Sequence, residues 1–141
     1  MNLDEFDIQK AVEDGLEVVI TYPADNKRKG IKAGDPSDMK VRVKGVGSEA
    51  FKKGVAAFNA YMESCRKDEK EPEDEEKRKL TAKMLAECTE GWENVKEKGK
   101  EVEFSKEAAF ETFYKHEWLA GQVANAIMDV DTMLEKNCQA S

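Results

Sequence analysis

The sequence predicts an α+β protein that is mainly α-helical and carries a small antiparallel β-sheet near its N-terminus. Two segments in the first third of the chain are typical of strands. LEVVITY at 16–22 is β-branched and aromatic, and MKVRVKG at 39–45 alternates apolar and basic side chains. Most of the remaining chain places apolar residues at helical spacing. With 141 residues, the chain can bury one modest core.

The N-terminal segments can be assigned in order. Residues 3–14 fit a short helix or an extended lead-in that ends at Gly15. Between the two strands, KRKGIKAGDPSD indicates a turn with a short strand near Ile31. Ser48 is a suitable N-cap for a helix over residues 48–65. The apolar positions on one face of that helix are Phe51, Val55, Phe58 and Met62.

A run of charge follows this helix. The segment RKDEKEPEDEEKRK at 66–79 is charged at every position except Pro72. Proline interrupts a helix, so the segment is either a solvated linker or a helix end followed by a helix start. We expect the chain to consist of an αβ part (1–65), a charged linker (66–79) and a helical part (80–141). The αβ part contains the strands 16–22 and 39–45 and the helix 48–65.

The C-terminal half begins with a helix that ends near Gly91, a common helix stop. Its predicted apolar stripe is Leu80, Met84 and Cys88. A hairpin-like excursion around Lys98 and Gly99 comes next, because glycine there favours a tight turn. The apolar residues that flank this turn are Trp92, Val95, Val102 and Phe104.

Two further helices complete the expected order. Ser105 is a good N-cap for a helix that carries three aromatic residues, Phe110, Phe113 and Tyr114. The last helix is expected over residues 117–136. Its apolar stripe is Leu119, Val123, Ile127, Val130 and Leu134.

Composition narrows the class of function. The formal net charge is −7 and 38% of the residues are charged, so the surface repels nucleic acid and anionic membranes. Neither a secretory signal nor a membrane-spanning helix is expected, which favours the cytoplasm. Protein partners are therefore the expected class, and self-association into a homo-oligomer is left open.

Catalytic and metal-binding patterns are not found in the sequence. The three cysteines Cys65, Cys88 and Cys138 are far apart, and the single histidine, His116, has Ala120 rather than a metal ligand at i+4. No glycine-rich loop precedes a helix in phosphate-binding form. We expect a protein that is not an enzyme and has no metal or organic cofactor.

Trp92 allows two interpretations. Aromatic residues at helical spacing more often belong to a core, so Trp92 is expected to pin two helices together rather than to hold a ligand. Trp118 and the final helix are expected to anchor a partner, because their apolar stripe is wider than a small core needs. The predicted partner-binding residues are Trp118, Leu119, Val123, Ile127, Val130 and Leu134.

The order of these segments resembles a known family. This order is similar to that in tail assembly chaperones of long-tailed bacteriophages. The segments that carry the resemblance are a strand ending in proline (EVVITYP), a second strand (MKVRVKG), a helix (SEAFKKGVAAF) and the segment AECTEGWENV…FSKEAAFETFYKHEWLAGQVANAI. The long charged segment at 66–79 departs from that pattern. The resemblance implies a host-cytoplasmic protein that binds the tape measure and tail tube proteins while the tail is built, and that a longer frameshifted product exists. A structural tail or head–tail component and a small acidic inhibitor of a host protein remain the alternatives.

Overall fold

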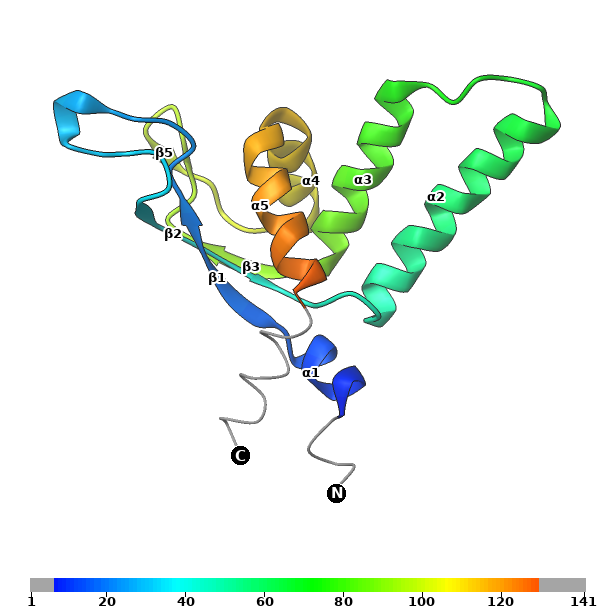
Figure 1. Ribbon diagram of the computed structural model, residues 1–141, viewed down its shortest axis with the longest axis horizontal. Coiled ribbons are helices and arrows are strands. Elements are labelled where there is room, and N and C mark those ends of the chain that lie inside the picture. The colour runs from blue at the N-terminus through cyan, green and yellow to red at the C-terminus, as the bar shows by residue number, and fades with distance from the viewer. Residues whose placement is uncertain (1–6, 130–141) are drawn as a thin grey trace.

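A computed structural model describes residues 7–129 of the chain, and Figure 1 shows its arrangement. The predicted α+β class is confirmed, because five α-helices accompany a small three-stranded antiparallel sheet and a two-stranded β-hairpin in this part of the chain. The elements are α1 (Ile8–Asp14), β1 (Leu16–Thr21), η2 (Lys27–Lys29), β2 (Pro36–Val43), α2 (Glu49–Lys67), α3 (Asp74–Cys88), β3 (Thr89–Glu93), β4 (Lys96–Glu97), β5 (Lys100–Glu101), α4 (Lys106–Lys115) and α5 (Glu117–Met128).

The sheet joins the two halves of the chain. Its strand order is β1-β2-β3, with Val41 of β2 opposite both Val18 and Trp92. The third strand comes from the part expected to be only helical, so the predicted division at 1–65 and 80–141 does not separate two independent units. The sequence does not indicate β3, because a glycine after a helical stripe predicts a helix stop, whereas Gly91 lies within the strand opposite Arg42.

The core lies between this sheet and the helices α3, α4 and α5. Figure 1 shows α4 and α5 side by side over the sheet, with α3 beside them. The opposite face of the sheet carries charged pairs, including Lys40–Glu17 at 3.7 Å and Arg42–Glu90 at 3.4 Å. The buried core residues are Ala11, Val12, Ile20, Val41, Val43, Ala82, Leu85, Ala86, Cys88, Ala109, Phe113, Leu119, Val123 and Ile127.

The charged segment is a helix end followed by a helix start, which was one of the two predicted alternatives. Arg66 and Lys67 belong to α2, and α3 begins at Asp74, so the connection is much shorter than the predicted linker at 66–79. Lys70 N–H donates to the carbonyl oxygen of Cys65 (2.9 Å) and closes the end of α2. Acidic residues in the first turn of α3 suit the positive end of that helix.

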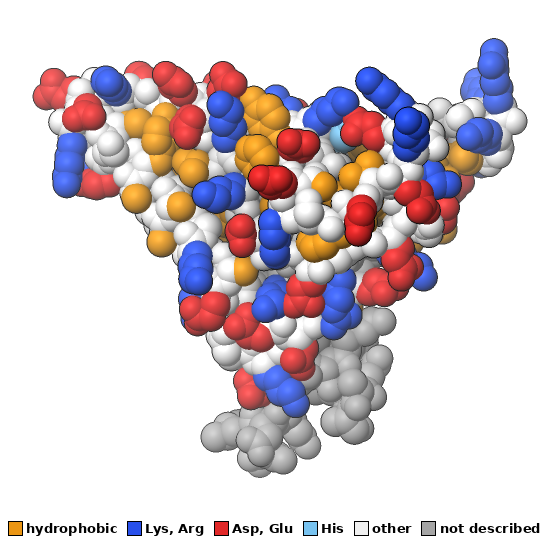
Figure 2. Space-filling model, turned by 180° about the vertical axis from the view of Figure 1, so that it is seen from behind, with side chains coloured by type: hydrophobic (Ala, Val, Ile, Leu, Met, Phe, Trp, Pro, Cys, Tyr) orange, Lys and Arg blue, Asp and Glu red, His pale blue; other side chains and the backbone are white. Residues whose placement is uncertain are grey.

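The α2–α3 hairpin lies at one side of the helical layer. Figure 1 places α2 at the outer side of α3, away from the sheet, and α2 packs chiefly against α3. Figure 2, seen from behind, shows hydrophobic side chains among charged ones over this side of the molecule, which lies to the left in that view. None of the helices in the described part of the chain has the length and hydropathy that a membrane crossing requires.

Candidate functional site

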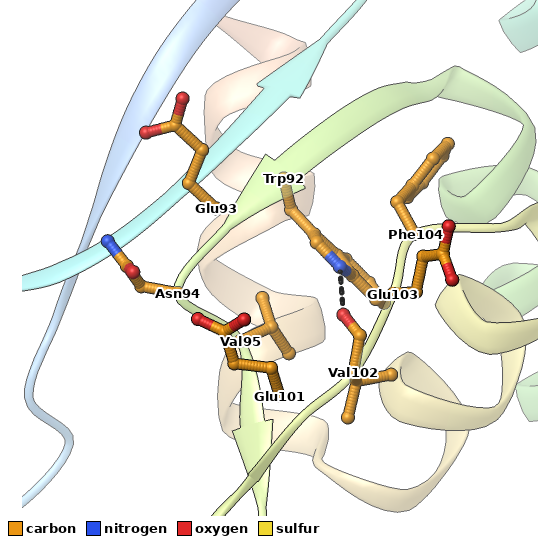
Figure 3. A pocket seen from close by; sticks show the side chains of 8 residues that line it. All are labelled: Trp92, Glu93, Asn94, Val95, Glu101, Val102, Glu103 and Phe104. Atoms are coloured by element: carbon orange, nitrogen blue, oxygen red, sulfur yellow. Dashed lines mark hydrogen bonds between the residues drawn. The ribbon is translucent and has the colours of Figure 1, made fainter.

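Trp92 lines an open hollow of about 630 Å³ beside the β4–β5 hairpin (Figure 3). Its indole N–H donates to the carbonyl oxygen of Val102 (2.8 Å), and its ring meets Phe104 and Phe113 edge-on at centroid distances of 5.3 and 6.4 Å. These contacts bind β3 to the segment before α4 and to α4 itself. The geometry favours a packing role for Trp92 over a ligand-binding one, but Trp92 joins strand β3 to α4 rather than two helices as predicted.

The rest of this hollow offers little to a ligand. Glu93, Glu101 and Glu103 are exposed, and Asn94 uses its side-chain N–H on the carbonyl oxygen of Asp38 (2.9 Å). Figure 3 shows Glu93 and Asn94 directed away from the Trp92 ring. Within residues 7–129, no group of three or more His, Cys, Asp or Glu side chains is placed to hold a metal ion.

His116 lies at the junction of α4 and α5 and faces the same hairpin. Its Nε2 is 3.4 Å from Glu97 Oε1, and Lys115 Nζ forms an ion pair with the same carboxylate. The hydrogen bond from Lys115, followed by that from His116, lowers the pKa of Glu97. This contact fixes the β4–β5 hairpin against the helix junction, which is a structural use of the only histidine in the sequence.

In its described part, Glu117–Met128, the final helix turns its apolar stripe toward the core of the chain. Leu119, Val123 and Ile127 are buried, because α5 packs directly against β1 and β2. In this structure, these three predicted partner-binding residues are used for packing within the chain itself. Trp118 is 40% exposed, so its role as a partner anchor stays a prediction. The other two predicted positions, Val130 and Leu134, lie outside the described residues.

An apolar groove of about 240 Å³ lies between α2 and α3. Gly54 sets its depth, because a Cβ atom at this position would be 2.2 Å from Cγ and 2.7 Å from Cβ of Met84. The two helices can therefore approach closely at that point. The eight lining residues, four from each helix, are Ala50, Lys53, Gly54, Ala57, Leu80, Lys83, Met84 and Glu87.

The groove arises because α3 has two apolar faces. Leu85 is buried in the core, whereas Leu80 and Met84 are only half-buried and line the groove toward α2. The predicted stripe of Leu80, Met84 and Cys88 is therefore divided, since Cys88 belongs to the core. Sequence reasoning missed the groove. The signal was the small residues of α2 at i, i+4 and i+7, which are Ala50, Gly54 and Ala57.

Comparisons of this chain with protein-family models, with curated proteins and with solved structures return no match. The groove can therefore be interpreted from its own lining. It has an apolar floor of small and medium side chains. Such a shape suits an apolar side chain or a helix face of another protein better than a polar small molecule.

Proposed function

We propose that this chain is a non-catalytic tail assembly chaperone of a long-tailed bacteriophage, acting in the host cytoplasm. In this proposal it binds the tape measure and tail tube proteins during tail assembly and holds apolar helical segments of these partners until they are packed. The order of segments described above, from EVVITYP to the final helix, supports the family assignment.

The observation that carries the proposal is the apolar groove between α2 and α3. An amphipathic helix can place its apolar face in such a groove, with anchors at helical spacing. Ala57 is a small lining residue that can accept a larger apolar side chain of a partner beside it, and Met84, which packs against Gly54, is an adaptable contact. A partner helix bound there would be shielded from association with other apolar surfaces.

The proposal is tested by co-expressing the tagged chain with the tape measure and tail tube proteins of the same phage. We expect both proteins to co-purify with the chain, and the soluble yield of the tape measure protein to rise. Purified virions should lack the chain. Its presence there at fixed stoichiometry would instead indicate a structural component. Binding to a basic host protein in the absence of tail proteins would indicate the acidic inhibitor.

A further inference from the structure

Two lysines that line the groove form no ion pair with any residue in the described part of the chain. Lys53 belongs to α2 and Lys83 to α3, so the groove has one cationic side chain on each wall. Among the described residues, neither lies within ion-pair distance of a carboxylate. Three neighbouring lysines on the same helices do form ion pairs, which are Lys52 with Glu49, Lys77 with Asp74 and Lys79 with Glu75.

The position of these lysines determines which partner the groove accepts. A lysine stem can extend the apolar floor while its amino group stays at the rim. A partner that covers the rim with apolar or basic groups would desolvate or repel the two ammonium groups. A partner that brings carboxylates would pair with them. Glu87 also lines the groove, but it leaves an excess of positive charge there.

We propose that the occupant of the groove is an amphipathic helix of a partner protein, with a narrow apolar stripe flanked by Asp or Glu on both sides. This inference rests on the proposed function in placing a partner helix in the groove, and it adds the charge pattern of that helix. The apolar stripe fills the floor around Gly54 and Met84, and the flanking carboxylates pair with Lys53 and Lys83 across the two walls.

The proposal predicts that the groove prefers an acidic helix to a basic one, which is the opposite of what the net charge of the chain would favour. The whole chain has a net charge of −7, so long-range attraction would favour a basic helix. At physiological ionic strength that attraction is screened beyond about 8 Å, whereas contacts at the groove rim act at shorter range. A preference for an acidic helix would therefore come from the local lysines and run against the net charge.

Two synthetic helical peptides of about five turns provide the test. Both carry the same leucine stripe, flanked by glutamate in one and by lysine in the other. Fluorescence anisotropy with the full chain measures their dissociation constants. We expect the glutamate peptide to bind about 2- to 30-fold more tightly, as two exposed ion pairs allow.

Matched variants of the chain test whether the preference for the glutamate peptide comes from the two groove lysines. Lys53→Glu and Lys83→Glu should each reduce the preference, and the double variant should reverse it. Lys52→Glu makes the same charge change on α2 outside the groove, so it should leave the preference unchanged. Circular dichroism checks that each variant is folded.

Several outcomes would overturn the proposal. These are equal binding of the two peptides, tighter binding of the lysine peptide, no binding of either peptide, or an equal effect of Lys52→Glu and Lys53→Glu. The proposed function is tested separately, by co-purification of the tail proteins. Tail proteins that co-purify with a chain lacking this preference would leave the chaperone proposal intact while removing the acidic-helix partner.

Discussion

The side-chain amide of Gln122 pairs with both backbone groups of Thr21, a residue 101 positions earlier in the chain. Gln122 Nε2 donates to the carbonyl oxygen of Thr21 (2.9 Å), and Gln122 Oε1 accepts from its backbone N–H (2.9 Å). β1 is an edge strand of the sheet, so this amide takes the place of a neighbouring strand at one residue. The contact fixes α5 against the sheet and covers part of its edge.

Replacing Gln122 should therefore reduce stability. Gln122→Leu leaves a partly buried N–H and carbonyl of Thr21 without their partner, which should lower the free energy of unfolding by about 1–3 kcal/mol. Urea denaturation measures this change. Asn125→Leu, at an exposed position on the same helix, should change it by about 0.5 kcal/mol or less. Equal effects of the two substitutions would show that the amide pairing is unimportant.

Substitutions of Trp92 and Trp118 should have different effects on stability, because Trp92 is packed within the protein and Trp118 lies at its surface. Trp92→Ala removes the ring packed against Phe104 and Phe113, which should lower the free energy of unfolding by about 3–5 kcal/mol. Trp92→Phe keeps a ring but loses the hydrogen bond to Val102, and should cost less. Trp118→Ala should stay within about 0.5 kcal/mol, because Trp118 is substantially exposed. An unchanged melting temperature for Trp92→Ala contradicts the pin interpretation.

Alanine substitutions at two helical glycines should change the free energy of unfolding in opposite directions. Gly54→Ala places a Cβ against Cγ and Cβ of Met84, so overpacking should lower the free energy of unfolding by about 1–3 kcal/mol. Gly121 in α5 has no atom within 4 Å of its added Cβ. Gly121→Ala should therefore raise stability by about 0.5–1 kcal/mol through helix propensity. Stabilisation of both variants would mean that α2 and α3 are not closely packed at Gly54.

Cys88 should make stability fall at alkaline pH. Burial raises the pKa of the Cys88 thiol to about 11, whereas an unfolded thiol titrates near about 8.5. The unfolded state therefore loses its proton first. The contribution of this thiol to stability is fully present below the unfolded pKa and declines as pH rises toward the folded value. The natural chain should therefore lose part of its advantage in urea midpoint over Cys88→Ala between neutral pH and about pH 10, and a difference that does not change with pH contradicts this assignment.

Local sequence signals predicted the first two strands and the helix starts. Ser48 Oγ accepts from the N–H of Phe51 (3.3 Å) and Ser105 Oγ from that of Ala108 (3.0 Å), so both predicted N-caps are confirmed. The hairpin at Lys98 and Gly99 is also confirmed, since both residues have positive φ as a tight two-residue turn requires. These features depend on neighbouring residues, which a sequence pattern can show.

Features that depend on distant pairing were not predicted. β3 becomes a strand by pairing with β2, and a glycine-containing segment such as TEGWE has little strand preference of its own. The groove requires two helices to meet at Gly54, and alanine and glycine positions do not form an obvious apolar stripe. The burial of Val123 and Ile127 likewise depends on how α5 packs against the sheet, which the helical period alone does not determine.

Blocking the groove tests the central claim most directly. Ala56 and Ala57 are adjacent exposed residues of α2, but only Ala57 lines the groove. Ala57→Trp should fill the groove without entering the core, and Ala56→Trp adds the same side chain outside it. Recovery of the co-expressed tape measure and tail tube proteins is then measured for both folded variants. We predict that Ala57→Trp loses most of these partners while Ala56→Trp keeps them, and equal recovery by the two variants would contradict a groove-bound partner.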